Sequence, residues 1–99
     1  YFENKDDHAG ELETSVMMYY HPELVNLDEA GEGTSKPFAL SSPNAQIAWL
    51  PRYWSKVSAD TGIGDPHKST PEKGERYAKA VIEKLALLFT EIGSKEVYL

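Results

Sequence analysis

The clearest alternation of apolar and polar positions lies in the last third of the sequence. Apolar residues recur there at i, i+3, i+4 and i+7, and charged residues fill most of the positions between them. Ser69 or Thr70 is placed to cap the N-terminus, Pro71 suits a first turn, and Gly93 is a typical C-terminal cap. The pattern predicts a helix from Pro71 to about Ile92. Its apolar face comprises Ala78, Val81, Ile82, Leu85, Leu88, Phe89 and Ile92.

A shorter amphipathic pattern predicts a second helix over about residues 10–20. A polar stretch, residues 6–15, leads into an apolar run that begins at Val16. The helix should end at His21, because a residue that precedes proline is pushed out of the α region. Glutamates in a first turn complement the helix dipole, so we expect Glu11 to be solvated and to serve only this purpose.

The sequence between these two helices indicates secondary structure less clearly. Residues 22–27 suggest a turn or distorted strand with its leucine and valine side chains directed inward, and residues 28–46 suggest a long loop. The aromatic-rich segment 47–57 contains Pro51, which favours an edge strand or an extended arm over a central strand. Residues 58–68 read as a turn-rich connector.

This inventory indicates an incomplete α/β architecture. Two helices and a few short strands cannot cover a sheet edge and an apolar helix face by themselves. We therefore expect residues 1–99 to form the C-terminal segment of one larger α/β domain whose N-terminal half lies outside this sequence. The sequence begins with Tyr1, which also suggests a processed or truncated piece. The alternative is a small acidic interaction domain that folds alone.

Composition narrows the possible functions. A net charge of −6 and a pI near 4.9 disfavour binding to nucleic acid or to anionic lipid. No apolar run approaches the roughly 20 residues that span a bilayer. Because the chain has no cysteine, metal ligands would have to be His, Asp or Glu. The lack of cysteine fits a reducing compartment, and we expect a cytoplasmic protein.

Candidate chemistry is concentrated in residues 6–15, at the positive end of the first helix. His8 is the one imidazole in this stretch, and Asp7 or Glu13 would fix its tautomer. Residue types alone leave open whether His8 acts in proton transfer or is an ordinary loop histidine. Trp49 and Trp54 suit either the roof of a substrate pocket or an interface between subunits, and the interface is favoured.

The sequence resembles the creatininase (creatinine amidohydrolase) family at three places in the right order. The first is Asp7-His8-Ala9-Gly10-Glu11-Leu12-Glu13-Thr14-Ser15, followed by His21-Pro22-Glu23-Leu24-Val25. The second is Gly62-Ile63-Gly64-Asp65-Pro66, and the third is Glu72-Lys73-Gly74-Glu75 at the start of the last helix. The resemblance spans nearly the whole chain and is poorest over residues 28–57.

The resemblance implies a three-layer α/β/α fold, a homo-oligomer that is often a hexamer, and a metal-dependent amidohydrolase. The divalent metal would be zinc, manganese or iron, held mostly by residues outside this chain. His8 aligns with the family's proton-transferring histidine, and Glu13 lies near the metals as a ligand or a supporting group. Asn4 and Lys5 stand where creatinine-specific members carry Trp and Asp, which argues against creatinine as the substrate.

The resemblance leads to two functional hypotheses. In the first, the protein hydrolyses a cyclic or other small-molecule amide, a reaction that needs an activated water and a proton for the leaving nitrogen. This chain would supply the catalytic His8 and one acidic group, and would be inactive alone. In the second, the family fold has lost catalysis and serves as an oligomeric binding or structural protein. Glu13 also retains a simpler interpretation as a first-turn glutamate that complements the helix dipole.

Overall fold

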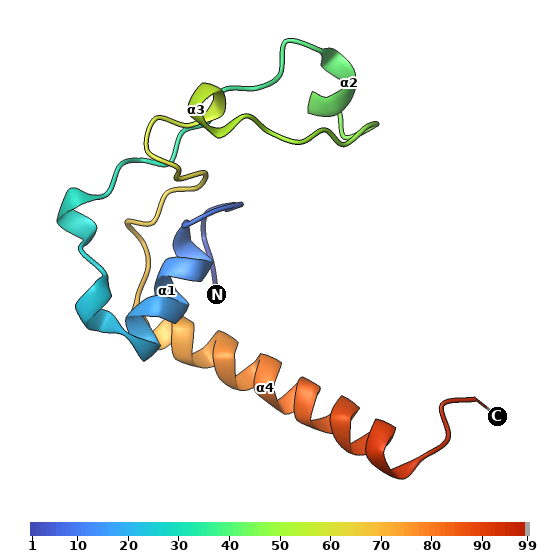
Figure 1. Cartoon of the computed structure of the whole chain (residues 1–99). Coiled ribbons are helices and arrows are strands. Elements are labelled where there is room, and N and C mark those ends of the chain that lie inside the picture. Colours follow the sequence, from blue (N-terminus) through green and yellow to red (C-terminus); the bar gives the residue numbers. More distant parts are fainter. Residues whose placement is uncertain (99) are drawn as a thin grey trace.

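Two helices that pack against each other form the framework of the chain. A computed structural model describes residues 1–98, in which α1 spans Glu11–Tyr20 and α4 spans Pro71–Ser94. Figure 1 shows α1 crossing the first turns of α4, while the rest of α4 extends away from the other elements. Both helices expected from the periodicity are confirmed. The end of α1 at Tyr20, before His21 and Pro22, agrees with the restriction that proline imposes.

The N-terminus of α4 is capped as its sequence predicts, but its C-terminus is not. The Thr70 hydroxyl accepts the Lys73 N–H at 3.1 Å, and Pro71 occupies the first turn. The expectation that Gly93 ends the helix is wrong, because the helix continues through Gly93 to Ser94. Its last turn keeps a backbone hydrogen bond from Lys95 N–H to the Glu91 carbonyl, so a left-handed glycine is not needed there.

The segment between the helices contains short helical turns and no strand. Of the alternatives expected for residues 22–27, the turn is confirmed and the distorted strand is wrong, and the edge strand over residues 47–57 is also wrong. Leu24 is exposed where an inward position was expected. Within residues 1–98, β-type pairing is limited to two isolated bridges, His8 with Ile63 and Ser35 with Ser58. The short helices are η1 (Pro22–Leu24), η2 (Leu27–Glu29), α2 (Ser41–Asn44) and α3 (Trp54–Val57).

The two main helices approach closely at a glycine. A Cβ at Gly74 would collide with the backbone carbonyl of Ser15, so a side chain at this position would force α1 and α4 apart. Ala78, one turn further along α4, is buried. Small residues on one face of α4 therefore set the distance between the helices.

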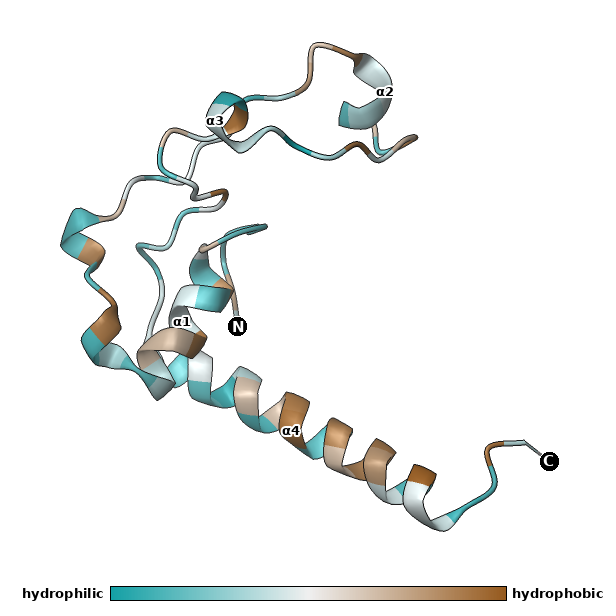
Figure 2. Cartoon of the chain, viewed as in Figure 1, coloured by the Kyte–Doolittle hydropathy of each residue, from teal (hydrophilic) through white to brown (hydrophobic). Residues whose placement is uncertain are grey.

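Much of the apolar surface of the chain remains open. Ile82, Leu85 and Phe89 on α4 are exposed, and Figure 2 shows apolar residues along the part of α4 that no other element covers. The radius of gyration is 17.5 Å, whereas about 13 Å is typical of a compact domain of roughly 100 residues. No helix in the described residues is long and apolar enough to cross a membrane. The chain is thus an open arrangement whose apolar faces lack a cover within residues 1–98.

Candidate active site

Two carboxylates, one from the loop and one from the helix, hold the loop before α1 to the helix. Gly10 is the N-cap and has no side chain to offer, so the first turn is capped from elsewhere. Asp6 Oδ2 accepts the Leu12 N–H at 2.7 Å, and Glu13 Oε2 accepts the Ala9 N–H at 2.6 Å. Both contacts satisfy amide groups that would otherwise be unpaired near the N-terminus of the helix. Glu13 therefore has a defined backbone contact in the loop that carries His8.

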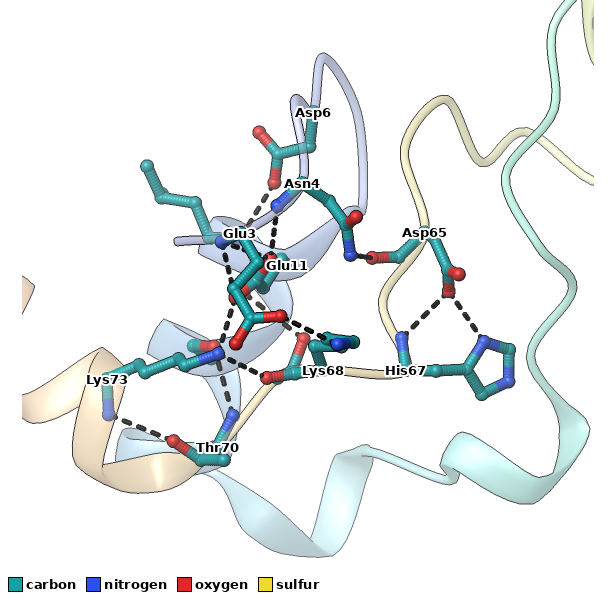
Figure 3. Close-up of polar contacts among 12 residues, drawn as sticks. Glu3, Asn4, Asp6, Glu11, Asp65, His67, Lys68, Thr70 and Lys73 are labelled. Atoms are coloured by element: carbon teal, nitrogen blue, oxygen red, sulfur yellow. Dashed lines mark hydrogen bonds and ion pairs between the residues drawn. The ribbon is translucent and has the colours of Figure 1, made fainter. Parts of the chain in front are cut away.

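Glu11 is not solvated, which corrects the expectation from sequence. Its side chain is 0% exposed, and its carboxylate accepts hydrogen bonds from the backbone amides of Glu3 and Asn4 and from the Lys73 ammonium at 2.6 Å (Figure 3). Burial alone would raise the pKa of the Glu11 carboxyl, but these hydrogen bonds outweigh burial and lower it. Glu11 thus joins the N-terminal segment, α1 and α4.

Hydroxyl groups continue this polar contact between the two helices. Ser69 Oγ donates to the Glu11 carbonyl at 3.1 Å, and the Thr70 N–H donates to Ser15 Oγ at 3.2 Å. Ser15 and Ser69 are both buried. They anchor the start of α4 to α1.

His8 is held by the connector that was expected to be rich in turns. Its backbone pairs with Ile63, with the His8 N–H donating at 3.0 Å and the Ile63 N–H donating at 2.9 Å. Its ring nitrogen Nδ1 lies 2.7 Å from the Thr61 carbonyl oxygen. Because a carbonyl only accepts, Nδ1 carries a proton, and Nε2 is left without a hydrogen-bond partner among residues 1–98. The nitrogen available for proton transfer is therefore Nε2.

The partner of His8 differs from the one expected. Neither Asp7 nor Glu13 forms a hydrogen bond with its ring, since Asp7 pairs with Arg52 and Glu13 binds the Ala9 amide. A backbone carbonyl fixes the tautomer instead. The assignment of Asp7 as a direct support of His8 is wrong in this respect.

Two residues beside the His8 ring adopt left-handed backbone conformations. Ala9 has φ +53° and Thr61 has φ +74°, a region that residues with a Cβ occupy at an energetic cost. Ala9 is held there by Glu13 and by the Thr14 hydroxyl, which donates to the Ala9 carbonyl at 3.2 Å. Such strain is common around functional sites, where surrounding contacts maintain it.

A row of four side chains leads from Asp7 to the His8 ring. Arg52 binds both carboxylate oxygens of Asp7, one of them at 3.0 Å, and its guanidinium lies 4.9 Å from the centre of the Trp54 ring. The Trp54 ring centre is in turn 5.0 Å from that of His8. Arg52 holds the pKa of the Asp7 carboxyl below its usual range by direct hydrogen bonding. The carboxylate is therefore ionised at neutral pH.

The two tryptophans occupy different surroundings. Trp54 contacts the His8 ring, whereas Trp49 is 84% exposed and lines an open cavity of about 630 Å³ beside Asp7 and Arg52. Either position is compatible with a substrate pocket or with an interface. His21 and His67 lie at the surface, paired with Glu23 and Asp65 respectively.

The described residues do not form a self-contained metal site. No group of three or more His, Asp or Glu side chains converges anywhere in residues 1–98. Glu13 has one oxygen engaged by the Ala9 amide, and His8 offers one nitrogen. Stable metal centres need more ligands than these two side chains supply. A metal at this place would need further ligands from outside the described residues.

Sequence comparison identifies the family. The sequence model of the creatininase family, described as creatinine amidohydrolase, matches residues 1–89. This chain belongs to the creatininase family. It is similar to the crystal structure of a putative creatinine amidohydrolase from Bacteroides fragilis, with 61% identity and a TM-score of 0.94 over 99% of this chain and 39% of that chain. At this level of similarity, the chain has the fold of the matched part of that protein, which is consistent with the α/β class.

Two curated relatives carry the name of a peptidase. Mycofactocin precursor peptide peptidases from Mycobacterium ulcerans and Mycolicibacterium smegmatis are 31% and 32% identical over 78 and 81 residues. These alignments cover 79% and 82% of this chain, and 30% and 31% of the relatives. The chain therefore spans about a third of the length of the curated relatives it matches.

The sequence does not indicate the roles that three residues have at the candidate site: Glu11, Arg52 and Thr61. Arg52 lies in the segment that resembles the family least, and nothing in its local sequence indicates that it pairs with a residue 45 positions earlier. Thr61 acts through its backbone carbonyl, which leaves no trace in residue type. Its position before Gly62 in a turn was the one available hint.

Proposed function

We propose that this chain supplies the acid–base histidine of a metal-dependent amidohydrolase. The observation that carries the proposal is the His8 ring, whose Nδ1 donates to the Thr61 carbonyl and whose Nε2 is available. It is supported by the family to which the chain belongs. The substrate would be a cyclic or other small amide, with a non-peptide C–N bond.

In this proposal His8 carries a proton during hydrolysis. Water adds to the amide carbon, the C–N bond breaks, and Nε2 delivers to the leaving nitrogen the proton that water gave up. The Thr61 carbonyl keeps the ring in one tautomer and stabilises the imidazolium through its hydrogen bond from Nδ1–H. The net reaction converts an amide and water into a carboxylate and a protonated amine, because the second proton of the water passes from the new carboxylic acid to the amine.

Zinc, manganese or iron belongs to this proposal as a divalent cofactor held mostly outside residues 1–98. Glu13 is the acidic group of this chain that we assign to it, as a ligand or as a supporting group. Because Glu13 also caps Ala9, Glu13→Gln separates the two roles. The amide oxygen of glutamine still accepts the Ala9 N–H, but the charge that a metal prefers is lost.

The exposed apolar surface of this chain needs a cover from outside residues 1–98. We propose that the chain forms the C-terminal part of a three-layer α/β/α domain, with the N-terminal half of the same protein and further copies covering the apolar face of α4. The open apolar surface and the radius of gyration of 17.5 Å support this. The residues described here would then be inactive without the remainder.

The test is a comparison of metal content and cyclic-amide hydrolysis in the intact protein and its variants. We expect His8→Ala to lower kcat at least about a hundredfold, as general acid–base catalysis contributes about that much or more. Glu13→Gln should lower bound metal while leaving thermal stability nearly unchanged. Unaltered turnover in His8→Ala would refute the assigned role of His8.

The second candidate is a family member without catalysis that assembles and binds. The exposed apolar face of α4 favours an assembling protein whether or not it is an enzyme. In that case the intact protein would form its oligomer, bind no divalent metal, and hydrolyse neither cyclic amides nor peptides.

A further inference from the structure

Asp7, Arg52 and Trp54, the three side chains that lead to His8, have no role in the reaction proposed above. Asp7 is 50% exposed and Arg52 is 32% exposed, and a surface ion pair of this kind normally contributes little to stability. The pair is nevertheless bidentate, and its guanidinium also lies against an aromatic ring. Two restraints on one long side chain fix its position more firmly than either restraint alone.

We propose that Arg52 is a positioning residue, which joins Asp7 to Trp54 and thereby holds Trp54 against the His8 imidazole. The proposal rests on the proposed role of His8. The Thr61 carbonyl fixes His8 at Nδ1, but one hydrogen bond leaves the ring able to tilt. The Trp54 ring, with its centre 5.0 Å away and inclined by 56°, restrains that tilt.

The chemistry of the arginine explains why another cation would not suffice. The planar guanidinium can bind a carboxylate in a fork and lie on an indole at the same time, which a lysine ammonium cannot do. Asp7 also neutralises Arg52, so that the imidazole beside Trp54 does not face an uncompensated positive charge. Asp7 therefore supports the position of His8 through Arg52 and Trp54, without a hydrogen bond of its own to the imidazole.

The chain offers a matched control in the same segment. The Lys56 ammonium lies 5.7 Å from the centre of the Tyr53 ring, so Lys56 and Tyr53 form a second cation–aromatic pair beside the first. Neither of these residues makes a hydrogen bond or ring contact with His8. A change at Lys56 therefore tests the general effect of disturbing α3, without the proposed connection to His8.

The kinetic test uses the intact protein with single and double variants. Arg52→Gln and Asp7→Asn should each lower kcat about tenfold with KM within about twofold, because a misplaced catalytic group slows the chemical step. The double variant should lose no more than either single variant, since both break one connection. Arg52→Lys should lower kcat as much as Arg52→Gln does. Trp54→Phe should retain most of the parent kcat, whereas Trp54→Leu should lose it. Lys56→Gln should have the same kcat as the parent protein.

Three kinetic outcomes would overturn the proposal. A rise in KM at constant kcat in Arg52→Gln would make Arg52 a substrate-binding residue. Full activity in Arg52→Lys would mean that Arg52 acts only through its positive charge. Additive losses of kcat in the double variant would mean that Asp7 and Arg52 act independently.

A readout that does not depend on turnover separates this inference from the proposed function. In proton NMR the ring protons of His8 should be displaced by the ring current of Trp54, with assignment by His8→Gln. The displacement should vanish in Trp54→Leu, shrink in Arg52→Gln, and persist in Lys56→Gln. If His8→Ala kept full turnover while these shifts changed as expected, the proposed function would fail but the positioning of His8 would stand. Unchanged shifts in Arg52→Gln would overturn the positioning itself.

Discussion

Glu11 carries a negative charge where solvent does not reach it. Its carboxylate is satisfied by two backbone amides and by Lys73, whose own side chain is only 21% exposed. A buried charge that loses its partners is costly, because its desolvation is no longer offset. At the residue scale, Glu11 is therefore the one buried carboxylate among residues 1–98, and it joins the N-terminal segment to α1 and α4.

The first prediction concerns removal of that charge. Glu11→Gln should lower the free energy of unfolding by about 2 to 3 kcal/mol, since Lys73 is left without its counter-ion. Glu75→Gln is the matched control, because Glu75 pairs with Lys79 at the same distance of 2.6 Å but on an exposed helix face. The control should change by less than about 0.5 kcal/mol. Urea denaturation of the intact protein measures both, and equal losses would contradict the role of Glu11.

A second prediction concerns acid. The folded pKa of Glu11 lies below its ordinary value of 4.5, so the unfolded chain binds the proton more readily. The contribution of Glu11 to stability is therefore complete above pH 4.5 and is lost as pH falls through the lower folded pKa. The parent protein should consequently lose stability below this pH more steeply than Glu11→Gln. Thermal melts between pH 3 and 7 compare the two slopes, and parallel curves would refute the prediction.

Comparison of Glu11 with Glu13 shows which features of the site local sequence does not determine. Glu11 and Glu13 both stand in the first turn of a helix, and local sequence gives them the same role. Their contacts differ because Glu11 faces α4 and the N-terminal segment, whereas Glu13 faces the loop at Ala9. That difference depends on contacts between residues up to 62 positions apart, which local patterns do not encode.

At the scale of elements, the crossing of α1 and α4 depends on a missing side chain. Gly74 brings α4 onto the Ser15 carbonyl. At Gly93 in the same helix, no atom of the described residues, apart from the neighbouring backbone of α4 itself, lies within 4 Å of the place where a Cβ would be. Both glycines weaken the helix intrinsically, but only Gly74 is required for packing.

The third prediction uses this pair. Gly74→Ala should destabilise the intact protein by about 2 kcal/mol or more, because the methyl group meets rigid backbone at Ser15. Gly93→Ala should instead stabilise it by up to about 1 kcal/mol through higher helix propensity. Denaturation midpoints of the two variants decide the matter. Similar shifts in the same direction would mean that the helices do not meet at Gly74 as described.

The elements also differ in how well local sequence predicts them. Both main helices follow from their 3.6-residue periodicity and from the Thr70 cap, since these signals act within a few turns. Over residues 47–57 the edge-strand alternative is wrong, because aromatic composition favours a strand, whereas here Trp54 begins a short helix held by contacts to His8 and Arg52. Tertiary contacts outweighed propensity in this segment.

At the scale of the whole molecule, the main feature is the exposed apolar face of α4. Ile82 is 55% exposed and Phe89 is 65% exposed, two turns apart on one side of the helix. Contiguous exposed apolar side chains usually mark an interface or a missing layer. The sequence correctly indicated that its two helices could not enclose a core, but it did not indicate which partner covers them.

The fourth prediction tests whether this face is covered in the intact protein. Phe89→Lys should lower the melting temperature by several degrees or dissociate the oligomer, since a charge would be buried in an apolar contact. Glu83→Lys, also on α4 but in a polar position, should do neither. Sedimentation velocity and thermal melts monitor both properties. A Phe89→Lys protein that matched the parent in both would show that the face is not buried.

The attachment of His8 to Thr61 has a consequence for the order of folding. The bond joins residues 53 positions apart, and closing a loop of that length costs about 3 to 4 kcal/mol in chain entropy before any contact offsets it. Local helix formation precedes such closure. The imidazole therefore acquires its tautomer and its neighbour Trp54 only late, after α1 and α4 have formed. A partly folded chain would contain every residue of the candidate site and none of its geometry, so completion of folding itself would determine when the chemistry begins.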